Sequence, residues 1–199
     1  IGHMFTNYKE NGVGTRVTVD IGGTTMQVFV TTNGAPSEKH SYAFHMGMYS
    51  IRSQVREKFK RLLKRPLTAN EVEEYIDKVC TRKNLQAKLD RGEFLTEEEQ
   101  VTYDKSLLKN PKMIEIIESV IKEQLKELDR ELAEINNFSL KTREEVFFVG
   151  GTSVQIGEYI KEHYSEDDVY INVLEDGLFS TVKGYYAYGL IINNANEVR

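Results

Sequence analysis

Residues 20–25 of this chain, Asp-Ile-Gly-Gly-Thr-Thr, combine a carboxylate, two glycines and two hydroxyls within six positions. On either side, residues 16–21 and 26–31 alternate between apolar and polar types, which predicts a hairpin with this segment as its turn. Glycines in that turn let backbone N–H groups approach a phosphate without a Cβ atom in the way. The carboxylate of Asp20 could hold Mg²⁺ through water molecules, because this ion keeps several waters when a protein binds it. The candidate ligand-binding residues of the turn are Gly22, Gly23, Thr24 and Thr25.

A second glycine pair, Gly150 and Gly151, follows the apolar run 145–149, which predicts a buried strand, and Thr152 comes directly after the pair. Glycines where a strand passes into a helix let a flat ligand or a phosphate lie against the backbone near the positive end of the helix. Each pair alone has a simpler interpretation, a tight hairpin in the first case and close packing in the second. Two such motifs at the ends of different strands favour a ligand site more strongly than either does alone.

The surrounding pattern predicts an α/β fold. Strands are expected at residues 16–21, 26–31, about 40–44, 145–149 and 169–173. Helices are expected at about 48–64, from 68 onward, at 96–108 and 111–135, from the second glycine pair to about 164, and at 178–192. Capping boxes at Thr68 with Glu71 and at Thr96 with Glu99 support two of these helix starts. Without the helical insertion, the order is three strands, helix, strand, helix, strand, helix, which is the ribonuclease-H-like order with a five-stranded mixed sheet.

The helix expected at 111–135 carries a regular apolar stripe. Its members are Ile114, Ile117, Ile121, Leu125, Leu128, Leu132 and Ile135. We expect this stripe to cover the sheet, with a coiled-coil seam as the alternative.

Composition excludes several classes of protein. The 199 residues carry 26 lysines and arginines against 31 aspartates and glutamates, a net charge of −5, which disfavours direct binding to nucleic acid or to an anionic membrane. The single cysteine, Cys80, cannot form an internal disulfide or a thiolate cluster, and this suits the reducing cytoplasm. No apolar run reaches the roughly 20 residues of a membrane span. The histidines show no metal-ligand spacing.

The two glycine motifs resemble those of the superfamily of actins, sugar kinases and heat-shock chaperone ATPases. Residues 19–28, Val-Asp-Ile-Gly-Gly-Thr-Thr-Met-Gln-Val, are similar to its second phosphate motif, and residues 148–156, Phe-Val-Gly-Gly-Thr-Ser-Val-Gln-Ile, to its adenosine motif. The strongest resemblance is to the plasmid-segregating bacterial actins of the ParM type, and it extends over nearly the whole chain. The first phosphate motif has no counterpart upstream. The resemblance therefore implies the second half of such a protein, with residues 5–46 and 109–199 as subdomain IIA and 47–108 as the inserted helical subdomain IIB.

The resemblance also implies roles for individual residues. Asp20 would be the catalytic carboxylate associated with Mg²⁺ and water, and Gly22, Gly23, Thr24 and Thr25 would hold the β- and γ-phosphates. Gly150, Gly151 and Thr152 would face the adenosine and the α-phosphate of ATP or ADP, with Thr152 in place of a usual third glycine. Within Arg56-Glu57-Lys58, Glu57 and Lys58 would contact the base and ribose.

The implied function is a nucleotide-binding domain of a cytoplasmic protein that forms ATP-dependent filaments for plasmid segregation. Such a protein associates with itself and with a DNA-bound adaptor protein, with no direct contact to DNA or membrane. Hydrolysis would be phosphoryl transfer to water, and we expect the isolated chain to be inactive. Two alternatives are a domain of a sugar or other small-molecule kinase of this superfamily, and a catalytically silent interaction module. The sugar kinases of the ROK type have a zinc-binding cysteine cluster, which a chain with one cysteine lacks.

Overall fold

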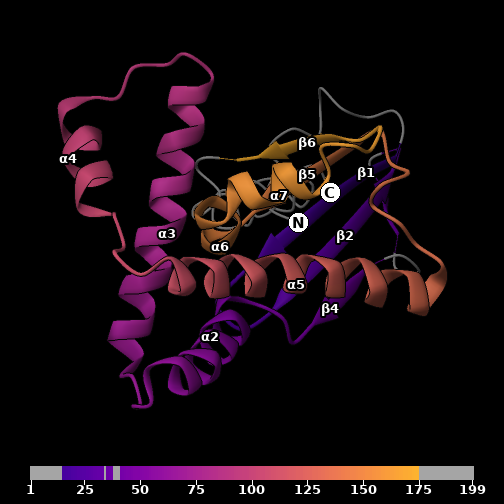
Figure 1. Ribbon diagram of the computed structural model, residues 1–199. Coiled ribbons are helices and arrows are strands. Elements are labelled where there is room, and N and C mark those ends of the chain that lie inside the picture. Colours follow the sequence, from indigo (N-terminus) through magenta and orange to yellow (C-terminus); the bar gives the residue numbers. More distant parts are fainter. Residues whose placement is uncertain (1–14, 34, 38–40, 175–199) are drawn as a thin grey trace, which may run out of the picture.

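A mixed β-sheet forms one layer of the computed structural model, which describes residues 15–33, 35–37 and 41–174 (Figure 1). The strands are β1 (Thr15–Ile21), β2 (Met26–Thr32), β3 (Ala35–Pro36), β4 (Tyr42–Phe44), β5 (Glu145–Val149) and β6 (Tyr170–Val173). All five strands predicted from the sequence are therefore confirmed, and the two-residue strand β3 is an addition.

The order of strands across the sheet is β3-β2-β1-β5-β6, and β4 also pairs with β2. Strand β3 pairs with residues 31 and 32 of β2, and β4 pairs with residues 26–28, so the two short strands lie one after the other along the same edge. The sheet is thus five strands wide, with an interrupted edge strand. Residues 33–37 contain glycine and proline, which favour a connecting segment, but an edge strand tolerates a proline, since one side of it needs no N–H donor.

Strand directions place the two glycine motifs side by side. Strand β1 pairs antiparallel with β2 and parallel with β5, and Asp20 stands opposite Val149 in the parallel pair. Because parallel strands end at the same edge of a sheet, the chain leaves β1 and β5 at neighbouring points.

The helices are α2 (Met48–Leu63), α3 (Ala69–Asp90), α4 (Glu97–Lys105), α5 (Pro111–Asn136), α6 (Gly151–Gln155) and α7 (Gly157–His163). Both predicted capping boxes are present, at Thr68 of α3 and Thr96 of α4. Helix α4 ends three residues earlier than predicted. The helix expected at 178–192 lies outside the described residues.

The single helix expected after the second glycine pair is two helices, α6 and α7, separated by Ile156. Gly157 begins α7 where a Cβ atom would lie 3.3 Å from Cγ1 of Val173 in β6. The break therefore accompanies a close approach of α7 to the edge of the sheet.

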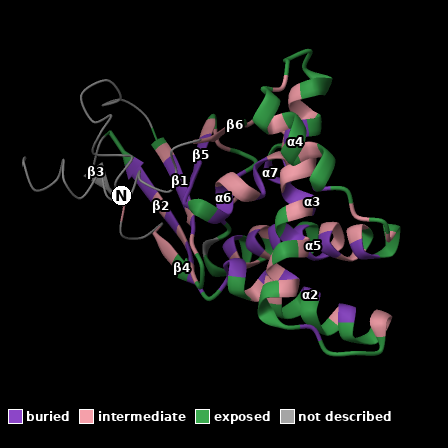
Figure 2. Ribbon diagram, turned by 90° about the vertical axis from the view of Figure 1, so that its left-hand side faces the viewer, coloured by how far each residue is buried: buried purple, intermediate pink, exposed green. Residues whose placement is uncertain are grey.

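Helix α5 covers one face of the sheet, and Figure 2 shows α2, α3 and α5 together on that side. Five members of its predicted stripe are fully buried: Ile117, Ile121, Leu125, Leu128 and Leu132. They pack in one cluster with sheet residues such as Val19 and Phe148, so the stripe covers the sheet. Ile135, at the end of the stripe, is 47% exposed.

The buried side chains of α2 and α3 belong to the same cluster as those of the sheet, and they include Ile51, Phe59 and Ile76. Helix α4 has no buried residue and packs on α3, where the guanidinium of Arg82 lies 4.1 Å from the ring centre of Tyr103. None of the described helices is long and apolar enough to cross a membrane.

Candidate functional site

The candidate site forms where β1 and β5 end. Gly150 follows β5 with φ of +92°, a conformation that residues with a side chain rarely adopt. A Cβ atom at this position would lie 2.5 Å from Oδ1 of Asp20 and 2.5 Å from the carbonyl oxygen of Ile21. The carboxylate of Asp20 therefore lies directly against the backbone of Gly150, and only glycine allows the two strand ends to approach so closely.

The hairpin turn between β1 and β2 is closed by its own backbone and held by two helices. The N–H of Gly22 donates to the carbonyl oxygen of Thr25 at 2.9 Å. The carbonyl oxygen of Gly22 accepts from the N–H of Met48 at 3.2 Å, and that of Gly23 accepts from the N–H of Tyr49 at 2.7 Å. The turn thus supplies acceptors to the first N–H groups of α2, which has no side-chain cap.

Gly47, which precedes α2, makes this contact possible and was not among the predicted site residues. A Cβ atom there would lie 2.7 Å from the carbonyl oxygen of Gly22 and 2.9 Å from that of Gly23. Its backbone is extended, with φ of −164°, so the glycine serves close approach and not an unusual conformation. The only sequence signal was a glycine just before a predicted helix.

Thr152 connects the second glycine motif to the first. Its side chain is buried, and its hydroxyl donates to the carbonyl oxygen of Gly22 at 2.9 Å. The neighbouring hydroxyl of Ser153 donates to the carbonyl oxygen of Val149 at 2.6 Å. These two hydroxyls bond to backbone carbonyl oxygens within the site. Because the hydroxyl of Thr152 is used in this way, Thr152 would contact a ligand through its backbone atoms. Thr24 and Gly23, by contrast, are exposed.

Comparison with known proteins shows which fold this arrangement belongs to. No protein-family model matches the sequence, and no curated protein matches it. Solved structures do match: the apo pSK41 ParM protein has a TM-score of 0.61 and 16% identity over 98% of this chain and 49% of its own. The archaeal actin homologue Ta0583 in complex with ADP has a TM-score of 0.65 and 13% identity over 94% of this chain and 55% of its own. The Alp12 filament subunit has a TM-score of 0.58 and 17% identity over 96% of this chain and 52% of its own.

The chain has the actin-like ATPase fold. It spans about half the length of the actin-like proteins it matches. Two of the matching structures are filament structures, those of Alp12 and of a ParM filament from Clostridium botulinum.

Within this actin-like chain, the predicted site residues fall into two groups. The structure brings together the strand end, the turn and the second glycine motif: Asp20, Gly22, Gly23, Thr24, Thr25, Gly150, Gly151 and Thr152. The other group lies further along α2, where Glu57 is exposed and Lys58 forms an ion pair with Glu123 of α5 at 3.0 Å. The Lys58 side chain thus reaches toward α5.

A different polar cluster lies between α2, α3 and α6. No sequence motif marks it, because its members come from three helices. Arg52 pairs with Glu73 at 2.5 Å, and Gln155 donates a hydrogen bond to Asp77. Burial, followed by the charge of Glu73, raises the pKa of Asp77. The Nε atom of Arg52 is buried without a partner. This cluster combines donors and acceptors of the kind that recognise ribose hydroxyls and base edges.

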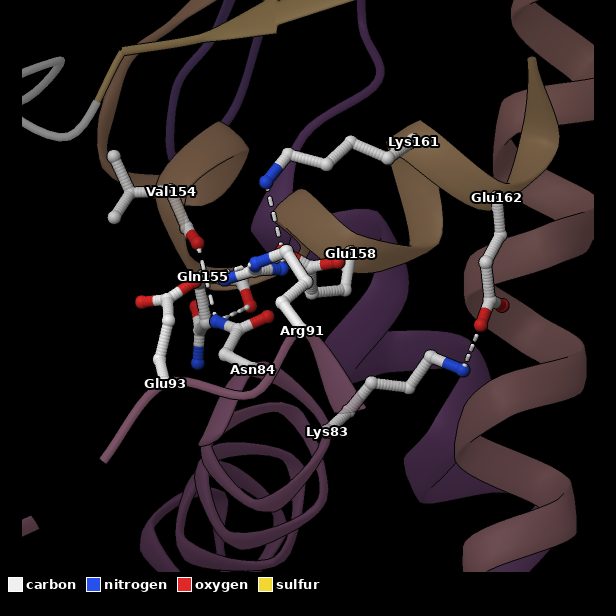
Figure 3. A network of polar contacts seen from close by, with 9 residues as sticks. All are labelled: Lys83, Asn84, Arg91, Glu93, Val154, Gln155, Glu158, Lys161 and Glu162. Atoms are coloured by element: carbon white, nitrogen blue, oxygen red, sulfur yellow. Dashed lines mark hydrogen bonds and ion pairs between the residues drawn. The ribbon is translucent and has the colours of Figure 1, made fainter. Parts of the chain in front are cut away.

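A network of polar contacts fixes α6 and α7 against α3 (Figure 3). The side-chain amide of Asn84 donates to the carbonyl oxygen of Gln155 at 3.1 Å. Glu158 of α7 accepts from Lys161 at 2.7 Å and pairs with Arg91 at 3.4 Å. Because these contacts lie on both short helices, the position of α6 beside the glycine turn depends on α3.

The residues of the site fit a Mg²⁺ ion bound through water. Among the residues that the structure describes, no group of three or more His, Cys, Asp or Glu side chains could hold a metal. Asp20 offers one carboxylate beside the glycine turn. That suits Mg²⁺, which binds through one or two carboxylates, phosphate oxygens and water.

Proposed function

We propose that this chain is the nucleotide-binding second half of an actin-like protein that forms ATP-dependent filaments for plasmid segregation. In this proposal, residues 5–46 and 109–199 form subdomain IIA, and residues 47–108 form subdomain IIB. One observation carries it: two glycine motifs, far apart in the sequence, meet at the ends of β1 and β5 with the Asp20 carboxylate against Gly150. The actin-like fold and the filament structures among its neighbours support the proposal that the protein forms filaments.

The proposed binding mode follows from what remains accessible. The turn at Gly22, Gly23, Thr24 and Thr25 would hold the β- and γ-phosphates, and its exposed residues Gly23 and Thr24 leave room for them. Gly150, Gly151 and Thr152 would lie along the adenosine and the α-phosphate through their backbone. Asp20 would orient the waters of Mg²⁺, and the ion would supply positive charge against the phosphate oxygens.

For the base and ribose, the cluster of Arg52, Glu73, Asp77 and Gln155 is an alternative to Glu57 and Lys58. Gln155 belongs to α6, which begins at the second glycine motif, so the cluster is continuous with the site. Lys58 is already paired with α5. We therefore assign base and ribose contacts first to the cluster.

The wider proposals concern the whole protein. It would be cytoplasmic, associate with itself into filaments and bind a DNA-bound adaptor, without direct contact to nucleic acid. Since the chain spans about half of its structural neighbours, the opposite phosphate loop would belong to a part outside these 199 residues. The isolated chain should then bind ATP weakly and hydrolyse it negligibly.

Calorimetric titration of the chain with ATP and Mg²⁺ tests the proposal. Asp20→Asn should weaken binding about tenfold or more, because the neutral amide loses the charge that faces the magnesium waters. Asp104→Asn, on the exposed face of α4, is the matched control and should leave binding unchanged. Absence of saturable ATP binding at millimolar concentration, or equal loss in both variants, would contradict a nucleotide site here. Filament formation needs a separate measurement, which is ATP-dependent pelleting of the longer protein.

A further inference from the structure

A groove of about 830 Å³ lies away from the glycine motifs, between α2, the C-terminal half of α5 and strand β4. The residues that line it include Ala43 and Phe44 of β4 and Glu123, Gln124, Glu127 and Glu131 of α5. Ser50 and Gln54 belong to the side of α2 that borders this groove, whereas Arg52 pairs with α3 beside the candidate nucleotide site. In Figure 1 the three elements meet where α5 passes over β4.

Gln124 is the unusual residue of this groove. Its side chain is 5% exposed, and its Oε1 atom is buried without a hydrogen-bond partner. Buried amides in folded proteins are nearly always hydrogen-bonded, since an unpaired one loses its bonds to water without replacement. A donor that enters the groove would restore the missing bond.

Strand β4 gives the groove a backbone edge. Its inner side pairs with β2, and no strand among residues 15–33, 35–37 and 41–174 pairs with its outer side. Phe44 of β4 stands opposite Met26, whose side chain is buried in the core, and Ala43 is exposed. An open strand edge beside a groove is the geometry in which an extended peptide adds a further strand.

The charges of the groove distinguish between possible occupants. Glu127 pairs with Arg130, and Glu123 pairs with Lys58. The hydrogen bond from Lys58, followed by one from Ser119, also lowers the pKa of Glu123. Among the described residues, no cation pairs with Glu131. An occupant with a positive side chain would complement this carboxylate, and the net charge of −5 would attract it over a distance.

We propose that this groove binds an extended segment of a partner protein that carries a lysine or arginine. The backbone of the segment pairs with the outer edge of β4. One of its donors bonds to Oε1 of Gln124, and its cationic side chain reaches Glu131.

The test measures binding of defined peptides to the ¹⁵N-labelled chain by NMR. The probes are end-blocked octapeptides of alternating valine and lysine, alternating threonine and arginine, and alternating valine and glutamate. A fourth probe repeats the valine–lysine peptide with methylated backbone nitrogens, which cannot donate. Lysine amide alone is the fifth probe. We expect the two basic peptides to shift the amide signals of Phe44 and His45, and the other three probes to bind about tenfold more weakly or not at all.

Two variants test the named side chains. Gln124→Leu should reduce affinity for the basic peptides about tenfold while its melting temperature stays equal or rises, because the buried unpaired amide is gone. Glu131→Gln should reduce affinity about threefold and make it less sensitive to salt. Glu115→Gln, an exposed residue elsewhere on α5, is the matched control and should change neither.

Other results would overturn the proposal. If neither basic peptide binds at millimolar concentration, or if Gln124→Leu binds as the unmodified chain does, the groove is not a peptide site. Equal binding of lysine amide would assign it to a small amine. A dimer of the chain alone that Gln124→Leu abolishes would assign it to a second copy.

Discussion

The hydroxyl of Thr152 donates a hydrogen bond to the carbonyl oxygen of Gly22 at 2.9 Å, across a separation of 130 residues. The same carbonyl oxygen accepts from the N–H of Met48. One backbone atom of the hairpin turn therefore joins the start of α2 and the start of α6. The geometry of the candidate phosphate turn depends on both helices.

We expect Thr152→Val to lower the free energy of unfolding by about 1 kcal/mol, since it keeps the shape of the side chain and removes one hydrogen bond. ATP affinity should fall as well, because the turn loses one of its two anchors. Thr152→Ser is the matched control: it loses a methyl group but keeps the hydroxyl, so its ATP affinity should stay near that of the unmodified chain. Chemical unfolding and calorimetric titration measure the two quantities, and equal affinities of the two variants would exclude a role for this hydrogen bond in binding.

Gly150→Ala should be strongly destabilising, because Gly150 is buried between the ends of β1 and β5. The added Cβ atom would meet both Asp20 and Ile21 at 2.5 Å, and the residue would also keep a positive φ. Gly92→Ala is a matched control, because Gly92 has φ of +78° with no atom within 4 Å of an added Cβ. We expect Gly92→Ala to lower the free energy of unfolding by about 1 kcal/mol, from backbone strain alone. Gly150→Ala should lower it by about 3 kcal/mol or more. Guanidinium unfolding checks the difference, and similar losses at both sites would show that the Asp20 contact relaxes easily.

Local signals explain which parts of the molecule the sequence predicted. Alternating apolar residues marked β1 and β2, and the Thr-x-x-Glu pattern marked the starts of α3 and α4, because each depends only on neighbours in the chain. The turn residues around Gly22 and the pair at Gly150 were likewise recognisable as motifs.

The features that the sequence did not predict depend on contacts between distant segments. The close approach of Gly47 to the turn, the break before Gly157 and the pairing of Gln155 with Asp77 each involve two elements that meet only in the fold. The hydroxyl of Thr152 is a clear case. The resemblance implies a place for this residue beside the nucleotide but says nothing of its hydroxyl, which in the structure donates to Gly22.

The capping box of α3 should respond to acid. A hydrogen bond from Arg65, followed by one from the backbone of Thr68, lowers the pKa of Glu71 to about 2 from its usual 4.5. Because the folded state has the lower pKa, the unfolded state binds more protons between these values. The stabilisation is complete above about pH 4.5 and is lost as the pH falls toward 2.

An NMR titration of the Glu71 carboxyl carbon measures this shift directly. Melting temperatures between pH 2 and 6 should depend less on pH in Glu71→Gln, since the amide still caps the helix but does not titrate in this range. Glu97→Gln, in the first turn of α4 but not its capping residue, is the matched control and should leave the pH profile unchanged. A Glu71 titration near pH 4.5 would show that the capping box is not formed in solution.

Gly151→Val should weaken nucleotide binding more than Val154→Ala does. Gly151 is the exposed first residue of α6, directly after the strand end that carries Gly150, so a branched side chain there would occupy the space proposed for the adenosine. Val154 lies one turn further on and is partly buried, and its truncation removes apolar groups worth about 0.8 kcal/mol each when fully buried. We therefore expect Gly151→Val to lower the ATP affinity more, and Val154→Ala to lower the melting temperature more. Calorimetric titration with ATP and Mg²⁺, with the longer protein where the isolated chain binds too weakly, compares the two variants. If Gly151→Val binds as tightly as the unmodified protein, the second glycine pair serves packing alone, and the adenosine must be held elsewhere.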